Sequence, residues 1–112
     1  MTVTIYHNPR CSKSRQTLQL LQDNNVEPTI IEYLETPPSA AELTEILTKM
    51  DAGPRDILRK KEAKEEGIDA DLDGDALISA IAAHPRALER PIVVKGNKAA
   101  MGRPPESVLE IL

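Results

Sequence analysis

Residues 3–33 read VTIYHNPRCSKSRQTLQLLQDNNVEPTIIEY, and this stretch decides the fold. Residues 3–6 are a β-branched and aromatic run that stops at the turn signal of residues 7–9, so a strand is predicted there. Leucines at helical spacing then predict a helix over residues 12–24, and residues 29–33 have the pattern of a second strand. A strand, a helix and a strand within about thirty residues form a βαβ unit with parallel strands and a right-handed crossover.

The rest of the chain continues with helices and ends with two strands and a helix. Ser39 and Glu42 form a capping box that predicts a helix over residues 40–50. The other predictions are a short helix over 54–59, an exposed charged segment over 60–73, a helix over 75–83, strands over 91–94 and 99–101 around a hairpin turn, and a final helix over 106–112. This order predicts an α/β protein with a thioredoxin-like fold, in which a mixed four-stranded sheet is flanked by helices and an inserted helical segment extends one end. We expect residues 1–112 to form a single domain.

Charge and composition exclude several classes of function. The 112 residues carry 14 basic and 18 acidic side chains, a net charge of −4, and Tyr6 and Tyr33 are the only aromatic residues. A chain with this charge and so few stacking side chains is not expected to bind nucleic acid. No signal peptide and no apolar run of membrane-spanning length is present, and one cysteine cannot form an internal disulfide. We therefore expect a cytoplasmic protein without membrane contact, and we expect a monomer.

Cys11 is the single cysteine, and it lies where the first predicted strand ends and the first helix begins. Backbone N–H groups of the first helical turn, with the positive end of the helix dipole, favour a thiolate there. Residues 1–15 contain no acidic side chain but carry Arg10, Lys13 and Arg15, which predicts a cationic pocket for a small anion and makes Arg15 a candidate ligand of that anion. The alternative is a buried, inert cysteine, but such a residue belongs in a strand or on an apolar helix face. We therefore favour a catalytic thiol.

Ser14 and His7 complete the predicted surroundings of the thiol. Ser14 lies three residues after the cysteine and can donate its hydroxyl to the sulfur, and a protonated His7 could support the thiolate from the other side of the loop. A dithiol redox enzyme has a second cysteine at the position of Ser14. Any disulfide formed in turnover must therefore use an outside thiol, such as glutathione or a glutaredoxin, and we expect no bound cofactor.

Three arginines lie far from the cysteine in the sequence, namely Arg59, Arg90 and Arg103. Taken alone, each fits a solvated surface charge, because most arginines are exposed. Arg90 precedes Pro91 at the start of a predicted strand. In thioredoxin-like folds a cis proline at this point faces the active-site cysteine, so Arg90 is expected to project into the site. A guanidinium suits a tetrahedral oxyanion because it can make two parallel charge-assisted hydrogen bonds.

Two other patterns point to structure rather than to ligands. Residues 69–74 resemble the start of an EF-hand loop, but Ala80 stands where the bidentate glutamate belongs, so we interpret them as an acidic turn that caps the next helix. His84, before Pro85, is expected to cap the end of a helix. One cysteine and two separated histidines predict no metal site.

Four motifs, in order along nearly the whole chain, resemble one known family. They are IYHNPRC (residues 5–11), EYLETPP (32–38), RPIVV (90–94) and GRPPE (102–106). They are similar to the ArsC-type, glutaredoxin-coupled arsenate reductases. Within that family, the residues Ser12-Lys13 and the end of the chain at Leu112 resemble the short YfgD-like branch.

This resemblance implies a function and assigns roles to named residues. It implies the thioredoxin-like fold, with Cys11 as the thiolate that attacks arsenate and with glutathione and glutaredoxin as the external reductant. It also implies that His7 and Ser14 support the thiolate. The residues that it assigns to oxyanion binding are Arg59, Arg90 and Arg103.

Two alternative functions stay open. The Spx regulators share this fold and bind RNA polymerase, but many of them use a two-cysteine switch at the positions held here by Cys11 and Ser14. The second alternative is a thiol reductase for another substrate, such as a glutathionylated protein.

Overall fold

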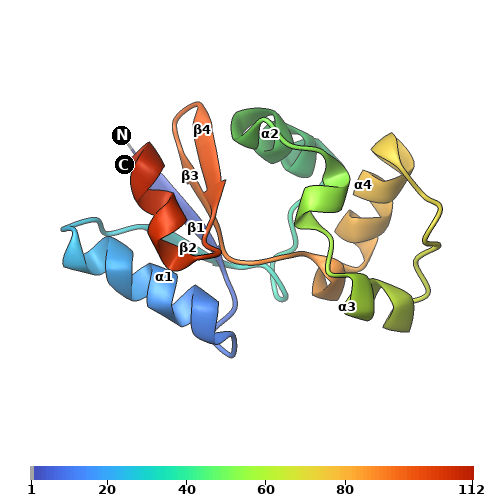
Figure 1. Cartoon of the computed structure of the whole chain (residues 1–112), viewed down its shortest axis with the longest axis horizontal. Coiled ribbons are helices and arrows are strands. Elements are labelled where there is room, and N and C mark those ends of the chain that lie inside the picture. Colours follow the sequence, from blue (N-terminus) through green and yellow to red (C-terminus); the bar gives the residue numbers. More distant parts are fainter. Residues whose placement is uncertain (1) are drawn as a thin grey trace. The chain divides into compact units, whose positions relative to one another are not determined.

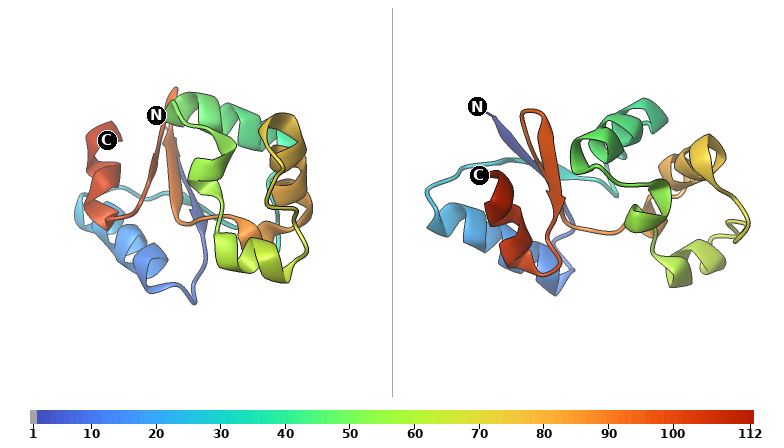
Figure 2. Two further views of the ribbon diagram at one scale, coloured as in Figure 1. Left: turned by 45° about the vertical axis from the view of Figure 1, so that its right-hand side comes forward. Right: turned by 45° about the horizontal axis from the view of Figure 1, so that its top comes forward.

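A computed structural model describes residues 2–112, which divide into two compact units. One unit comprises the chain up to Thr36 together with Arg90–Leu112, and the other comprises Pro37–Glu89. The first unit holds a four-stranded sheet, whereas the second consists of helices and turns (Figures 1 and 2). The expectation of a single domain over residues 1–112 stays a prediction.

The sheet of the first unit has the strand order β2-β1-β3-β4. β1 (Val3–His7) pairs in parallel with β2 (Thr29–Glu32) and antiparallel with β3 (Ile92–Lys95), and β3 pairs antiparallel with β4 (Lys98–Met101). The mixed four-stranded sheet predicted from the element order is therefore confirmed. β1 is buried along most of its length because it has a neighbour on each side, while the edge strand β2 is largely exposed.

Two helices of the first unit pack on one face of the sheet. They are α1 (Ser12–Asp23) and the final 3-10 helix η3 (Pro105–Ile111), which contact each other and lie together beside the sheet (Figures 1 and 2). Alternate residues of a strand point to the same face, so β1 contributes two side chains to this core. The buried residues of the core are Val3, Ile5, Leu21, Val93 and Val108.

The second unit contains three α-helices and two short 3-10 turns. Its elements are α2 (Ala40–Met50), η1 (Pro54–Ile57), α3 (Lys60–Glu65), α4 (Gly74–Ala83) and η2 (Pro85–Ala87). The predicted capping box is present, because Ser39 Oγ accepts the Glu42 N–H at 3.1 Å and Glu42 Oε1 accepts the Ser39 N–H at 3.0 Å. Asp73 caps α4 by accepting the Gly74 N–H, so the acidic turn has its predicted role.

Three helical segments differ from the sequence-based expectation. The short helix predicted over residues 54–59 is a 3-10 helix that ends at Ile57. Helix α3 forms inside the segment predicted only as charged and exposed. Five of its six residues are charged and Ala63 alone is buried, so no hydrophobic period marks it in the sequence. The final helix begins at Pro105, one residue earlier than expected, and it is a 3-10 helix.

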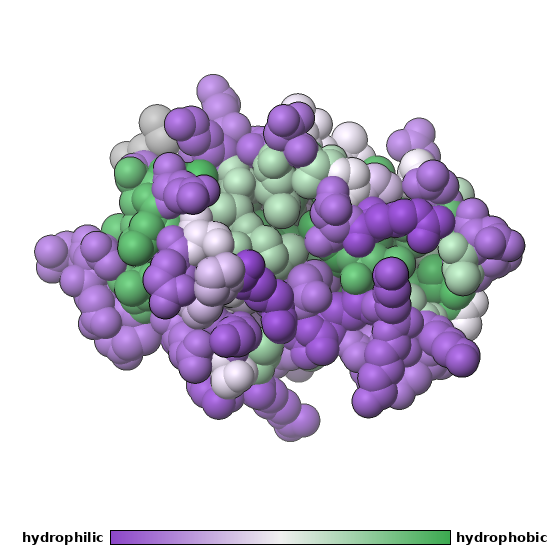
Figure 3. Space-filling model, in the orientation of Figure 1, coloured by the Kyte–Doolittle hydropathy of each residue, from purple (hydrophilic) through white to green (hydrophobic). Residues whose placement is uncertain are grey.

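Hydrophilic side chains cover most of the face shown in Figure 3. The large hydrophobic residues that are exposed in the described chain are Ile30, Leu34 and Leu109. No helix within residues 2–112 is long and apolar enough to cross a membrane.

Candidate active site

The loop between β1 and α1 is fixed by the buried side chain of Asn8. The side-chain Oδ1 accepts the Arg10 N–H at 3.0 Å, and the side-chain Nδ2 donates to the Tyr33 hydroxyl at 3.4 Å. The backbone oxygen of Asn8 accepts the Cys11 N–H at 3.0 Å. The Asn8 N–H in turn donates to Ser14 Oγ at 3.0 Å. Sequence reasoning did not assign Asn8 to the site. An Asn-Pro pair is a turn signal, and this turn sets the position of the cysteine.

Cys11 is the N-cap of α1 and is partly exposed, as the sequence predicted for its place in the chain. Burial raises the pKa of the thiol, but hydrogen bonds to the sulfur from the Ser14 N–H, from the Arg90 side chain and from the Lys13 N–H outweigh it. The pKa of Cys11 is consequently lowered from its ordinary value. Arg103 adds a further donor, with Nη2 at 3.5 Å from the sulfur. The sulfur therefore lies among two helical N–H groups and two guanidinium groups, which together favour a thiolate.

The register of the sheet explains why the two arginines reach the sulfur. Tyr6 pairs with Ile92, and Ile92 pairs with Met101. The start of β3 and the end of β4 thus lie beside the loop that follows β1. Arg90 immediately precedes Pro91 before β3, and Arg103 follows β4, where its Nε donates to the backbone oxygen of Arg90 at 2.8 Å.

The peptide bonds before Pro91 and Pro104 are both cis. The cis proline expected at Pro91 is therefore confirmed, and so is the projection of Arg90 into the site, since its side chain hydrogen-bonds to the Cys11 sulfur.

Gly102 lies between β4 and Arg103, in close contact with two neighbours. A Cβ atom at this position would lie 2.5 Å from Thr17 Oγ1 and 2.7 Å from Pro91 Cγ. The Gly102 N–H donates to the Pro91 oxygen at 2.9 Å. Only glycine fits this approach, which holds the segments of Arg90 and Arg103 against α1. Sequence reasoning did not assign Gly102 to the site, since the contact depends on tertiary packing.

Ser14 and His7 form a buried pair behind the cysteine. Ser14 Oγ lies 2.6 Å from Nδ1 of His7 and also accepts the Asn8 N–H. The Ser14 hydroxyl was expected to donate to the sulfur, but it bonds to His7 instead, and the backbone N–H of Ser14 contacts the sulfur. Burial lowers the pKa of His7, although Glu32 raises it in part. The lowered pKa favours the neutral imidazole, and the contact between His7 and the site runs through the Ser14 hydroxyl.

The remaining two predicted ligands have other contacts in this structure. Arg15 is exposed, and its Nη1 donates to the Pro9 backbone oxygen at 2.9 Å, so it braces the loop that carries the cysteine. Arg59 belongs to the second unit, where it forms ion pairs with Glu62 and, at 2.7 Å, with Glu89. Oxyanion binding by Arg15 and Arg59 stays a prediction.

Within residues 2–112, no group of three or more His, Cys, Asp or Glu side chains could hold a metal ion. The first unit instead brings together a thiol with a lowered pKa and the guanidinium groups of Arg90 and Arg103. Such a site can bind a small oxyanion and attack it with sulfur.

Comparison with known proteins gives one consistent result. The family model described as "ArsC family" matches residues 6–111. Over 114 residues the chain is 52% identical to the uncharacterized protein YfgD of Escherichia coli (strain K12), covering 98% of this chain and 96% of that protein. It is 47% identical to an arsenate reductase of Neisseria meningitidis serogroup A, covering 98% of this chain and 97% of that protein. A solved structure, the arsenate reductase from Vibrio cholerae, has a TM-score of 0.92 at 48% identity and covers 100% of this chain and 98% of that chain. The predicted thioredoxin-like fold is thereby confirmed.

Proposed function

The chain belongs to the ArsC family, and we propose on this basis that it reduces arsenate to arsenite through the Cys11 thiolate, with glutathione and glutaredoxin as the external reductant. The observation that carries the proposal is the set of contacts around the sulfur. Two helical N–H groups and the side chains of Arg90 and Arg103 converge on one thiol. A thiolate at neutral pH is a strong nucleophile, and the same cations attract a tetrahedral oxyanion.

The proposed reaction begins with attack of the Cys11 thiolate on arsenic. A sulfur–arsenic bond forms and one arsenate oxygen leaves as water, so arsenic remains in the +5 state. Arg90 and Arg103 stabilise the negative charge on the oxyanion as the bond forms. Because Ser14 holds the place where a dithiol enzyme has its second cysteine, both electrons must come from thiols outside the chain.

Glutathione then attacks the adduct and replaces a second arsenic oxygen, which also leaves as water. The thiolate of glutaredoxin attacks the glutathionyl sulfur and forms a mixed disulfide, and the electron pair of the broken sulfur–arsenic bond reduces arsenic to the +3 state. Water finally hydrolyses the remaining bond, releasing arsenite and the Cys11 thiol. In sum, arsenate and two thiols give arsenite, one disulfide and one net water.

Two further parts of the proposal rest on the family resemblance. Arg59 joins Arg90 and Arg103 in oxyanion binding, which requires the substrate to compete with the carboxylates of Glu62 and Glu89 for its guanidinium. The protein works as a cytoplasmic monomer, in the compartment where glutathione keeps thiols reduced. The Spx-like alternative gains no support from the site, since Ser14 replaces the second cysteine of its switch.

The proposal is tested by reductant consumption on arsenate, with purified protein, glutathione and glutaredoxin. We expect Cys11→Ser to abolish turnover. We expect Arg103→Ala to raise the KM for arsenate about tenfold or more, because a hydrogen bond to a charged group contributes about 1.5–3 kcal/mol.

The matched control is Arg86→Ala, which removes an exposed arginine of the second unit that pairs with Glu65 and Glu66. This variant should retain wild-type kinetics. Failure of the wild-type protein to consume reductant on arsenate would rule out the proposed function.

A further inference from the structure

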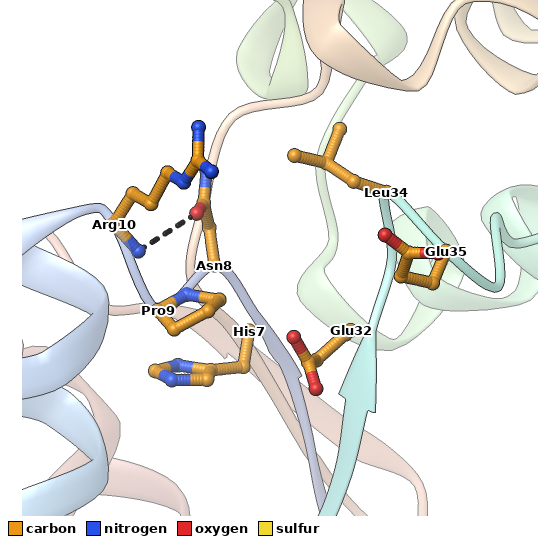
Figure 4. Close-up of a pocket in the computed structure, with 7 residues that line it drawn as sticks. All are labelled: His7, Asn8, Pro9, Arg10, Glu32, Leu34 and Glu35. Atoms are coloured by element: carbon orange, nitrogen blue, oxygen red, sulfur yellow. Dashed lines mark hydrogen bonds between the residues drawn. The ribbon is translucent and has the colours of Figure 1, made fainter.

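A cavity of about 390 Å³ opens beside the loop that carries the cysteine (Figure 4). Residues 7–10 line one side, and Glu32, Leu34 and Glu35 line the other. Both walls belong to the first unit, and the sheet register pairs His7 directly with Glu32. Strand pairing therefore joins the two walls at His7 and Glu32, where both walls begin. The volume lies within the range of about 300–1,000 Å³ that is typical of small-molecule sites.

The two walls carry opposite charges. Arg10 stands on the loop side, and Glu32 and Glu35 stand on the β2 side (Figure 4). Within residues 2–112, none of these three side chains forms an ion pair or a side-chain hydrogen bond with another residue. The Arg10 contact drawn in Figure 4 uses its backbone N–H, which donates to Asn8 Oδ1. A cation on one wall of an open cavity and two carboxylates on the other are complementary to a zwitterion.

The same loop carries both the cavity wall and the nucleophile. Cys11 directly follows Arg10, and its N–H is bonded to the backbone oxygen of Asn8, another lining residue. A ligand seated against Arg10 therefore lies on the loop one residue before the thiol. Leu34, which is 42% exposed, offers an apolar contact for the methylene groups of such a ligand.

We propose that this cavity is the subsite for the reductant, and that it recognises the zwitterionic end of a γ-glutamyl thiol peptide. The inference rests on the proposed function, which requires such a thiol to reach an arsenic atom on Cys11. Arg10 receives the α-carboxylate of the γ-glutamyl group, and Glu32 and Glu35 receive its ammonium group. The thiol of the peptide is then directed along the loop toward the adduct, where its sulfur bonds to arsenic.

The binding test uses S-methylglutathione, which carries the zwitterion but no thiol. Titration followed by NMR should shift amide signals of residues 7–10 and 32–35. Arg10→Ala and the double variant Glu32→Gln/Glu35→Gln should each weaken binding about tenfold, equal to about 1.4 kcal/mol. The matched controls are Lys98→Ala and Glu110→Gln, which remove exposed charges outside the cavity and should leave the affinity unchanged.

A second probe separates charge recognition from nonspecific effects. N-acetyl-S-methylglutathione lacks the ammonium group, so the double variant Glu32→Gln/Glu35→Gln should no longer weaken its binding, whereas Arg10→Ala still should. A loss of affinity that appears only with the probe that carries the ammonium group identifies a specific pairing of that group with the two carboxylates, as in a double-mutant cycle. Equal losses for both probes would overturn the assignment of the two carboxylates.

The outcome is independent of whether arsenate is the substrate. If the wild-type protein binds S-methylglutathione in this way but does not reduce arsenate, the subsite stands and the proposed function fails. If it reduces arsenate while Arg10→Ala and the double carboxylate variant leave both the Kd for S-methylglutathione and the KM for glutathione unchanged, the function stands and the subsite is refuted.

Discussion

Replacing Gly102 by alanine tests how the two arginines are held at the sulfur. The added Cβ would lie 2.5 Å from Thr17 Oγ1 and 2.7 Å from Pro91 Cγ, far inside the 3.4 Å at which ordinary contact begins. Neither Thr17 nor Pro91 is free to move away from the added Cβ. Thr17 is fully buried and its hydroxyl donates to the Lys13 backbone oxygen at 2.8 Å, and the ring of Pro91 is rigid.

The expected cost follows from this overlap. Overpacking of a close-packed interior costs about 1–3 kcal/mol. In a chain of this size each kcal/mol lowers Tm by about 4 °C, so Gly102→Ala should lower Tm by roughly 4–12 °C. The relief of the clash also moves the segment of Arg103 away from Cys11 Sγ, from which its Nη2 lies 3.5 Å away. The thiol should therefore react more slowly at neutral pH.

Two assays follow these effects, calorimetry for Tm and the rate of alkylation of Cys11 by iodoacetamide at neutral pH. The matched control is Gly53→Ala, where the new Cβ would meet only Asp56 Oδ2 at 3.9 Å, an ordinary contact, and where φ is −101°. This control should lose no stability. A Gly102→Ala protein that melts and alkylates like the wild type would refute the packing argument.

Three further predictions follow from the buried pair and the cationic contacts. Ser14→Ala should lower the free energy of unfolding by about 1–3 kcal/mol, because it leaves the Asn8 N–H and His7 Nδ1 without their partner; an unchanged urea midpoint would contradict this. Burial lowers the pKa of His7 below 6.5, so the unfolded chain binds more protons and stability should fall as the pH drops below about 6.5. Denaturation at a series of pH values measures this slope, and a His7→Gln variant should flatten it. Arg90→Gln should raise the pKa of Cys11 and slow its alkylation at neutral pH, and an unaltered rate would show that Arg90 does not act on the sulfur.

Local sequence signals were enough to predict most of the fold. The βαβ unit depends on patterns within residues 3–33, and the Ser39–Glu42 capping box is a contact between near neighbours. Helix α3 was missed because Ala63 is its only buried residue, which leaves no period to detect.

The site was predictable only where it is local. The place of Cys11 at the start of α1 follows from the turn signal that precedes it. Arg103 comes from 92 residues farther along the chain, and neither its contact with the sulfur nor the close approach of Gly102 has a local signal, because both depend on how β3 and β4 pair. The roles of Arg90 and Arg103 came from the family resemblance, and the structure supplied the sheet register that brings them to the loop.

The hydroxyl of Ser14 shows why hydrogen-bond partners are hard to predict from the sequence. Its sequence position allowed a hydrogen bond to the sulfur, but buried polar groups bind whichever partner lies within reach. Here that partner is His7. Sequence spacing indicates that two groups can meet, and only the packed structure decides which pair does.

The most direct test of the central claim is the titration of the Cys11 thiolate, followed by its ultraviolet absorbance and corrected with Cys11→Ser as the blank. The hydrogen bonds to the sulfur predict a midpoint below the ordinary thiol value of about 8.5. Arsenate should raise this midpoint, because an anion held by the same cations repels the thiolate. A midpoint at or above about 8.5 that arsenate does not move would contradict the account.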